Sequence, residues 1–423
     1  MAINAPKGTK DILPSQAYRW RYVERKFAEL CERAGFSEIR TPEFEHTELF
    51  ARGVGDTSDI VEKQMYTFSD YAGRSITLRP EGTAGVVRSF IEHKLYAGTM
   101  PAKLRYEISC FRYEKPQSGR LRAFHQFGVE IFGADGMIAD TEVIALADDF
   151  LRGLGLTDLE LRINSIGCPD CRGGYREALK AFLAPKYDEL CETCKSRYER
   201  NPMRVLDCKS PHCHALTEGA PLMIDYLCDG CKEAFDDLQA NLTALGIAYI
   251  VDPSIVRGLD YYTKTAFEFV TEHIGAQGTV CGGGRYDHLI EELGGPPIPG
   301  VGFGLGIERL LLLLENCGID LPNPDGPDAL VAFIGAEAKG GALQLLRSLR
   351  EAGLSAEIDS LGRSIKNQFK YADRIGARHV VIIGDEELQS GQATVKDMNT
   401  GTQERVAFEK VAERINRNKQ ENE

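Results

Sequence analysis

The order of predicted helices and strands changes near residues 317–328, and this change constrains the fold more than any other feature of the sequence. The stretch holds three prolines and two glycines and has no hydrophobic periodicity, as is typical of an interdomain linker. Before it, helices and strands follow one another without regular alternation, which indicates an α+β domain on an antiparallel sheet. After it they alternate. The sequence therefore predicts two domains of different fold class.

Hydrophobic periodicity defines the elements on both sides of this linker. In the first domain it predicts a helix from Tyr18 to Gly35 and strands at Leu104–Arg112 and Phe124–Phe132. In the second domain the order strand, helix, strand, helix, strand implies mainly parallel pairing. The five elements of the second domain are 329–334, 341–352, 355–358, 365–375 and 379–384.

Length and composition indicate a globular protein. The chain has 423 residues, of which 43% are hydrophobic and 27% charged, enough for two or three domains. It has no apolar run near the roughly 20 residues that span a bilayer, and its N-terminal segment lacks a signal-peptide core. We expect a cytoplasmic protein with no membrane partner. The net charge of −13 argues against a wholly basic nucleic-acid binder but allows a local basic surface.

Three arginines and a phenylalanine gather around the loop that joins two predicted strands. They are Arg112, Arg120, Arg122 and Phe124. Arginines in fixed positions suit phosphate oxygens because the guanidinium presents several donors in a planar fork. A phenylalanine beside them can stack on a base. The alternative interpretation is a charged surface hairpin.

Three glycine-rich segments could line a pocket. Gly302–Leu310 combines glycines, which let another group approach the backbone, with a helix start that carries Arg309. Arg257–Tyr262 and Gly282–Asp287 place a cation and several tyrosines near glycine turns. Taken singly, the first segment is also explained by a turn before a core helix, and the others by aromatic residues packing on a sheet.

Together these segments resemble the motifs of class II aminoacyl-tRNA synthetases. Residues 18–42 resemble the dimer-forming motif 1, residues 111–126 resemble motif 2 and residues 302–310 resemble motif 3. Within that class the chain resembles the histidyl-tRNA synthetases, from about residue 5 to about residue 415. The segments that are similar to features of the histidine enzymes are 7–11, 78–83, 257–262 and 282–287.

This resemblance implies a fold and a reaction. Residues 1–322 would form the catalytic domain, interrupted by a helical insertion at 168–245; residues 323–328 would be a linker and residues 329–423 an anticodon-binding α/β domain. The implied enzyme is an AMP-forming ligase. It activates L-histidine with ATP to histidyl-adenylate and pyrophosphate, then passes histidine to the 3′ end of tRNA(His). Motif 1 implies a homodimer.

The resemblance also implies an ATP site. Arg112 would hold the α-phosphate and Arg309 the far end of the triphosphate, with Mg²⁺ bridging phosphates. Phe124 would stack on adenine, Glu114 would lie near its amino group, and Arg120 would complete the site. The reaction needs positioned charge and no enzyme nucleophile. The implied catalytic residues are Arg112, Arg257 and Arg309.

A histidine site is implied in the same way. Glu81 and Thr83 would receive the α-ammonium group, and Glu130 and Tyr262 would bind the imidazole. The imidazole has two ring nitrogens, so selective binding needs polar partners at both ends. The full set is Glu81, Gly82, Thr83, Gln126, Glu130, Tyr261, Tyr262 and Tyr286.

Basic residues recur at steps of three or four along the predicted helix 365–375 and form one stripe. A solvated helix face is the alternative, but the resemblance gives this domain the anticodon arm of tRNA. The implied tRNA-binding residues are Arg122, Arg363, Lys366, Lys370 and Arg374. The chain departs from the family at Ala123, where a polar residue is usual, and at Lys264, where glycine is common. These departures concern details of acceptor-stem contact.

Eight of the twelve cysteines form four close pairs between residues 168 and 231. In a chain without a secretory signal, such pairs indicate zinc rather than disulfides. Up to two structural zinc sites could be filled, and a helical insertion with unligated cysteines is the alternative. Zinc is not a general feature of the family. The candidate ligands are Cys168, Cys171, Cys191, Cys194, Cys208, Cys213, Cys228 and Cys231.

Three other functions share some of these features. A non-catalytic, synthetase-like regulatory subunit of ATP phosphoribosyltransferase would usually lack the C-terminal domain and the segment 257–262, and both are present here. A class II synthetase for proline, threonine or glycine would have different pocket segments. An RNA-binding module of a larger regulator would leave more of the chain unexplained.

Overall fold

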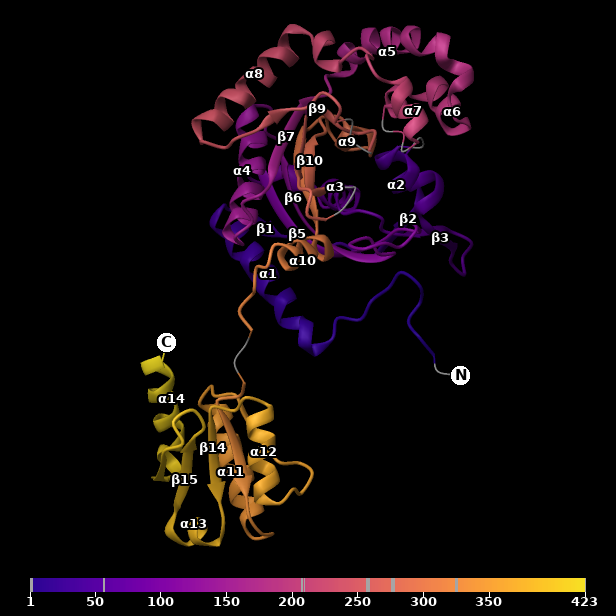
Figure 1. Ribbon diagram of the computed structural model, residues 1–423. Helices are drawn as coiled ribbons and strands as arrows, with labels where there is room; N and C mark the ends of the chain where they lie inside the picture. Colours follow the sequence, from indigo (N-terminus) through magenta and orange to yellow (C-terminus); the bar gives the residue numbers. More distant parts are fainter. Residues whose placement is uncertain are drawn as a thin grey trace. The chain divides into compact units, whose positions relative to one another are not determined.

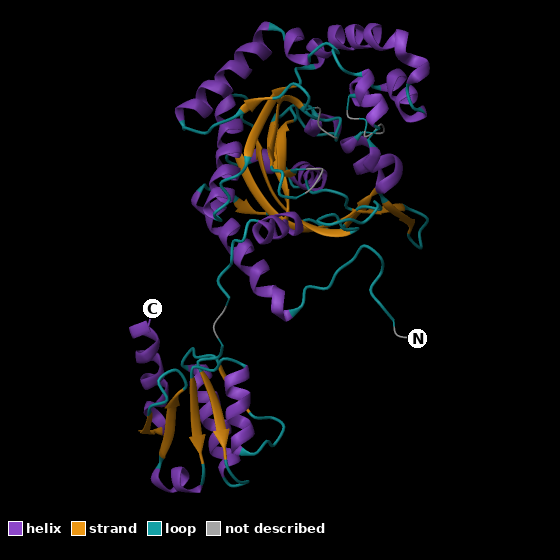
Figure 2. Cartoon of the chain, viewed as in Figure 1, coloured by secondary structure: helices purple, strands orange, loops and turns teal. Residues whose placement is uncertain are grey.

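The computed structural model describes residues 3–55, 58–206, 208, 210–255, 259–274, 278–323 and 326–422. The chain divides into two compact units, Met1–Pro322 and Asn323–Glu423. Each unit has its own sheet and hydrophobic core (Figures 1 and 2). Among the helices of these described residues, none is long and apolar enough to cross a membrane.

An eight-stranded sheet forms the centre of the large unit. Its strands in chain order are β1 (Ser37–Glu38), β5 (Ala102–Phe111), β6 (Ala123–Phe132), β7 (Glu160–Ser165), β8 (Ile250–Val251), β9 (Thr263–Val270), β10 (Thr279–Arg285) and β11 (Gly300–Gly306). The spatial order is β1-β5-β6-β11-β10-β9-β7-β8. The inner pairings are antiparallel, and the two edge strands pair in parallel. The predicted α+β class is confirmed, as are both predicted strands, which are β5 and β6.

Helices cover both faces of this sheet. The helices that contribute to its main core are α1 (Pro14–Arg33), α4 (Met137–Gly153), α8 (Asp229–Ala244) and α10 (Ile307–Asn316). A second core lies on the opposite face, with α3 (Thr83–Glu92) and α9 (Leu289–Glu292). The side chains of β6 point alternately to the two faces of the sheet, so the strand contributes to both cores. Phe127 and Val129 belong to the first core and Phe132 belongs to the second. The predicted helix 18–35 is confirmed as α1.

Two further layers complete the large unit. A three-stranded sheet of β2 (Phe44–His46), β4 (Ser75–Leu78) and β3 (Tyr66–Ser69) precedes α3, and α2 (Thr47–Val54) lies beside it. A helical segment with a small core of its own contains α5 (Pro169–Leu183), α6 (Glu192–Arg200) and α7 (Pro211–Leu216), and it ends with α8. Figure 1 shows α5, α6 and α7 grouped together.

The small unit is a five-stranded sheet with helices. The strand order is β13 (Ala356–Ile358), β12 (Ala329–Phe333), β14 (His379–Ile383), β15 (Gln392–Asp397) and β16 (Gln403–Ala407). The helices are α11 (Ala338–Glu351), α12 (Ile365–Arg374), α13 (Asp385–Ser390) and α14 (Val411–Asn422). The three predicted strands are confirmed and pair in parallel.

The hairpin β15–β16 was not predicted, and it corrects the expectation of mainly parallel pairing. The strand β15 pairs in an antiparallel direction with β14 and with β16. The turn of the hairpin forms because Asp397 Oδ1 accepts the N–H groups of Asn399 and Thr400, at 2.8 and 2.9 Å, and Gly401 adopts a φ of +74°. The strand β16 carries little hydrophobic alternation in its sequence, so periodicity could not identify it.

Candidate functional site

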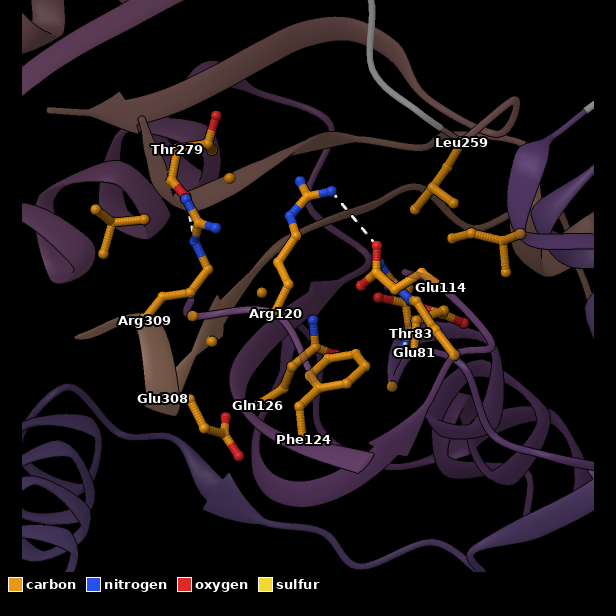
Figure 3. Close-up of a pocket in the computed structure, with 18 of the residues that line it drawn as sticks. Glu81, Thr83, Glu114, Arg120, Phe124, Gln126, Leu259, Thr279, Glu308 and Arg309 are labelled. Atoms are coloured by element: carbon orange, nitrogen blue, oxygen red, sulfur yellow. Dashed lines mark hydrogen bonds and ion pairs between the residues drawn. The ribbon is translucent and has the colours of Figure 1, made fainter. Parts of the chain in front are cut away.

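A cavity of about 340 Å³ lies in the large unit, where the N-terminus of α3 meets β5, β6, β9, β10 and β11 (Figure 3). The predicted site residues that line it are Glu81, Gly82, Thr83, Arg112, Glu114, Arg120, Phe124, Gln126, Tyr261, Tyr262 and Arg309. Glu130, Tyr286 and Arg122 are not part of the lining. Arg257 lies outside the described residues. Segments far apart in the sequence thus meet around a space of the size that holds small ligands.

Backbone carbonyls orient two arginines of this cavity. Arg112 donates from Nε to the carbonyl of Pro80 at 2.8 Å, and its guanidinium lies 5.2 Å from the centroid of the Phe124 ring. Arg309, at the start of α10, donates from Nε to the carbonyl of Thr279 at 3.0 Å. One donor of each guanidinium is therefore bound to the backbone, which restrains the direction of its other donors.

A third arginine adds to the positive charge. Arg120 Nη1 donates to Glu114 Oε2 at 3.4 Å (Figure 3). Burial lowers the pKa of Arg309 and the charge of Arg120 lowers it further, while Glu114 acts in the opposite direction. Like charges held together in a partly buried cavity favour a ligand with several negative charges.

Glu81 and Thr83 line the cavity on the side away from Arg309 in the view of Figure 3. Glu81 accepts the N–H of Thr83 at 2.7 Å and the N–H of Ala84 at 2.8 Å, so it occupies the N-terminal turn of α3. Burial raises the pKa of Glu81, although these N–H groups and the charge of Arg112 lower it. A buried carboxylate of this kind is stabilised further by a cationic ligand.

Glu130 lies fully buried next to the cavity. Its Oε1 accepts hydrogen bonds from the hydroxyls of Thr83 at 2.8 Å and Tyr106 at 3.0 Å, and its Oε2 accepts one from Tyr286. Burial raises the pKa of Glu130 to about 8 in spite of these three donors. Thr83 therefore connects this carboxyl group with the cavity, and a direct contact of Glu130 with a ligand stays a prediction.

Three tyrosine rings pack against one another beside this carboxyl group: Tyr261 and Tyr262 line the cavity, and Tyr286 binds Glu130. The ring centroids of Tyr261 and Tyr262 are 4.6 Å apart, and Tyr286 lies 5.5 and 6.3 Å from them. Burial raises the pKa of Tyr261 and of Tyr286 well above the ordinary value, so both hydroxyls stay neutral. Neutral hydroxyls can donate and accept, which suits a polar ring with both kinds of nitrogen.

Replacing Glu130 with glutamine is expected to flatten the pH dependence of stability. The pKa of Glu130 is about 8 in the folded protein and about 4.5 without burial, so the folded state binds more protons between these values. Its contribution to stability is therefore complete below about pH 4.5 and is lost as the pH rises through about 8. Glu130→Gln removes the titrating group, and its free energy of unfolding should change less between about pH 5 and about pH 8.

Urea unfolding at both pH values checks this prediction. Glu351→Gln is the matched control, because the Glu351 side chain is 63% exposed and should leave the pH dependence unchanged. Equal pH dependence in wild type and Glu130→Gln would contradict the raised pKa.

Tyr106 is a residue of this site that the sequence analysis missed. Its ring fits against two glycines: a Cβ at Gly128 would lie 2.1 Å from the ring, and a Cβ at Gly82 would lie 2.4 Å from it. Glycine in the middle of β6 signals a close approach of another group, but that group can be identified only with the register of β5, which pairs Tyr106 with Gly128. The other polar side chains of the lining that were not predicted are those of Glu268, Thr279 and Glu308.

Arg122, a predicted tRNA contact, packs against the N-terminal segment. Its guanidinium lies 3.9 Å from the centroid of the Tyr113 ring, and its backbone N–H donates to the carbonyl of Gly8 at 2.7 Å. Gly8 has a φ of +90°, and a Cβ there would lie 2.7 Å from the Arg122 side chain. The observed contacts are those of packing, and a contact with tRNA stays a prediction.

The other predicted tRNA-binding residues belong to the small unit. Three of them are exposed on α12, at intervals of four residues: Lys366, Lys370 and Arg374. Arg363 differs from them, because it forms an ion pair with Asp359 and its guanidinium lies 4.4 Å from the centroid of the Tyr371 ring. On α12 the exposed basic residues are therefore Lys366, Lys370 and Arg374, and the contact of the predicted residues with tRNA stays a prediction.

Lys264, where glycine is common in the family, has a φ of +46°. This left-handed conformation favours glycine. An ion pair with Asp287 at 2.9 Å and a backbone hydrogen bond to Gly167 at 2.9 Å hold the lysine there. Lys264 is not part of the lining of the cavity.

The eight cysteines of the helical segment converge in two groups of four. The first is Cys168, Cys171, Cys228 and Cys231, and the second is Cys191, Cys194, Cys208 and Cys213. Within each group all sulfur atoms lie within 4.8 Å of one another, so each group could hold a metal ion. All eight are free thiols.

Comparison with known proteins gives one consistent result. The family described as "Histidyl-tRNA synthetase" matches residues 8–310, and the family described as "Anticodon binding domain" matches residues 328–418. The histidine–tRNA ligase of Caldanaerobacter subterraneus is 59% identical over 98% of this chain and 100% of its own length. The histidine–tRNA ligase of Thermoanaerobacter pseudethanolicus is 57% identical over 98% of this chain and 99% of its own length. The crystal structure of the apo histidyl-tRNA synthetase from S. aureus is 43% identical, covers 98% of this chain and 100% of its own, and has a TM-score of 0.84. The chain therefore belongs to the histidyl-tRNA synthetase family.

Proposed function

We propose that the chain is a histidine–tRNA ligase, which activates L-histidine with ATP in the cavity of the large unit and then charges tRNA(His). The observation that carries the proposal is that three arginines and Phe124 share one cavity with Glu81, Thr83 and Tyr262. The first group suits a nucleoside triphosphate, and the second suits an amino acid with a polar side chain. Both reactants of an adenylation would meet in one space.

The proposed first step is an in-line displacement at phosphorus. A carboxylate oxygen of histidine bonds to the α-phosphorus of ATP, and the bond from that phosphorus to the bridging oxygen breaks and releases pyrophosphate. Arg112 would hold the α-phosphate, and Arg309 and Arg120 the far end of the triphosphate, which enters as its Mg²⁺ complex. The arginine side chains are oriented before the reaction, so they would stabilise the developing negative charge without rearrangement. By resemblance to the family, Arg257 would act on the same phosphate.

The nucleoside and the amino acid would bind on either side of this phosphate. Phe124 would stack on adenine, with Glu114 near its amino group. The α-ammonium group would approach Glu81, whose buried carboxylate favours a cation, together with Gly82 and Thr83. The groups proposed around the imidazole are Gln126, Glu130, Tyr261, Tyr262 and Tyr286. The hydroxyl-rich surroundings of Glu130 support this part of the proposal.

In the second step a ribose hydroxyl at the 3′ end of tRNA(His) bonds to the histidyl carbonyl carbon, and AMP leaves. The test is aminoacylation with labelled histidine, ATP and Mg²⁺. We expect label in tRNA(His) and none in a proline tRNA. Label in neither tRNA, or label in the proline tRNA, would contradict the proposal. A homodimer is proposed from residues 18–42, and sedimentation would reveal it.

Removing two positive charges from α12 is expected to weaken the binding of tRNA without affecting the activation of histidine. In Lys366→Ala/Lys370→Ala, the KM for tRNA(His) should rise by roughly tenfold, and its salt dependence should fall, because two phosphate contacts are lost. ATP–pyrophosphate exchange needs no tRNA and should not change. Lys339→Ala/Lys410→Ala removes two exposed lysines of the same unit as a control. An unchanged KM for tRNA would contradict the role of the stripe.

The regulatory-subunit alternative is not favoured by any observation on the described residues. The cavity keeps its arginines and its polar amino-acid side together, and the anticodon-binding family matches the C-terminal residues. A regulatory protein needs neither feature.

A further inference from the structure

We propose that the helical segment of the large unit binds two Zn²⁺ ions, one in each group of four cysteines. Site 1 is Cys168, Cys171, Cys228 and Cys231, and site 2 is Cys191, Cys194, Cys208 and Cys213. Each site draws one close pair from each of two separate stretches of chain. The proposal concerns the helical segment and does not depend on the function proposed for the cavity.

The distances between sulfur atoms suit a tetrahedral metal ion. Zinc–thiolate bonds of about 2.3 Å place the sulfurs of a tetrahedral site about 3.8 Å apart. The sulfur of Cys168 lies 3.5 Å from that of Cys171 and 4.0 Å from that of Cys228. A disulfide would need about 2.0 Å. Four soft thiolates in a tetrahedron select zinc, or iron in a cluster, over Mg²⁺ and Ca²⁺.

Three of the four cysteine pairs stand at helix N-termini. Cys168, Cys191 and Cys228 are the residues immediately before α5, α6 and α8, and each partner lies in the first turn. The positive end of each helix faces the sulfurs and favours thiolates, the form that binds metal. Backbone N–H groups add to this effect, because Cys228 donates to the Cys171 sulfur at 3.1 Å and Cys191 to the Cys213 sulfur at 3.4 Å.

The helical segment has a small hydrophobic core, and in segments of this kind a metal site often adds stability. Of the eleven buried residues in its core cluster, four are cysteines of the two groups: Cys171, Cys194, Cys213 and Cys231. Segments of this size bury too little apolar surface to be stable by packing alone, and structural zinc supplies the difference. Site 1 joins the start of the segment, at α5, to its end, at α8. Site 2 joins the start of α6 to α7 in the middle of the segment.

Each site would also fix an arginine that supports the cavity. Arg172, next to Cys171, donates to the backbone carbonyl of Tyr262. Arg204, between Cys194 and Cys208, donates to Asp260 Oδ1 from Nη2 at 2.8 Å and from Nε at 3.1 Å. Tyr262 lines the cavity, so the zinc sites would position this wall of it. This consequence rests on the proposed function, whereas the zinc content does not.

Metal analysis of the full chain, purified under reducing conditions without added metal or chelator, tests the proposal. We expect two zinc ions per chain. Cys171→Ser/Cys231→Ser and Cys194→Ser/Cys213→Ser should each keep one, and Cys317→Ser, outside both groups, should keep two. Zinc content near zero, iron in place of zinc, or two zinc ions in either double variant would overturn the proposal.

A second measurement covers the case in which a double variant fails to fold. Cobalt exchanged into the wild-type protein should bind at two equivalents, with the absorption of a tetrahedral tetrathiolate site, and cobalt spectra without that signature would overturn the proposal. Arg204→Ala should keep both zinc ions and raise the KM for histidine more than it lowers kcat, and Arg204→Lys should recover part of the KM. An unchanged KM would overturn the positioning role while leaving the zinc count intact.

Discussion

Replacing Arg112 with alanine is expected to slow histidine-dependent ATP–pyrophosphate exchange by about 10²- to 10³-fold, the usual effect of removing one oriented donor from a transition state. The Pro80 carbonyl and the Phe124 ring hold this guanidinium in place before any ligand binds. The guanidinium would therefore stabilise the negative charge that develops on the α-phosphate without having to move. Because the contact strengthens in the transition state, the loss should appear in kcat as well as in kcat/KM.

Two further variants separate this effect from a general one. Arg112→Lys keeps the charge but loses the planar fork, so it should recover only part of the exchange. Arg74→Ala removes an arginine that is 65% exposed in the same unit, and it should leave exchange unchanged. Exchange at the wild-type rate in Arg112→Ala, with an unchanged melting curve, would contradict the role of this arginine.

Replacing Arg285 with methionine is expected to destabilise the large unit by about 3–5 kcal/mol, because it leaves a buried carboxylate unpaired. Arg285 and Asp140 are both fully buried and form an ion pair. Arg285 also donates to the carbonyls of Ala134 at 2.9 Å and Gly136 at 3.2 Å, and to Asp287 at 3.1 Å. One side chain thus ties β10 to the start of α4.

Chemical denaturation of a double-mutant cycle measures this contribution. Arg285→Met/Asp140→Asn removes both charges and should be more stable than Arg285→Met alone. Arg347→Met is the control, since its ion pair with Glu351 joins side chains that are 81% and 63% exposed, and it should cost less than about 1 kcal/mol. A loss below about 1 kcal/mol in Arg285→Met would contradict the structural role.

Local sequence patterns were sufficient for the main architecture. The helix α1 and the strands β5 and β6 follow from hydrophobic periods of about four and two residues. The basic stripe of α12 was predicted in the same way, but the ion pair of Arg363 was not. Its pairing with Asp359 depends on the loop before the helix, and helical spacing contains no information about that loop.

Contacts across the sheet could not be predicted from a single sequence. Glu130 was named for the imidazole, yet its three hydroxyl partners come from α3, from β5 and from the loop after β10. Periodicity does not report which parts of the chain meet. Tyr106 was missed for the same reason. The cysteine spacings indicated metal ligands, but which pairs join became clear only when α5 and α8 were placed together.

The central claim is that one cavity binds both ATP and histidine and joins them. The measurement that tests it most directly is ATP–pyrophosphate exchange with each standard amino acid supplied singly, in the absence of tRNA. Exchange with histidine, and with no other amino acid, is the predicted result. Exchange driven by proline or threonine would show that the pocket is for another substrate, and the absence of exchange with any amino acid would contradict the account.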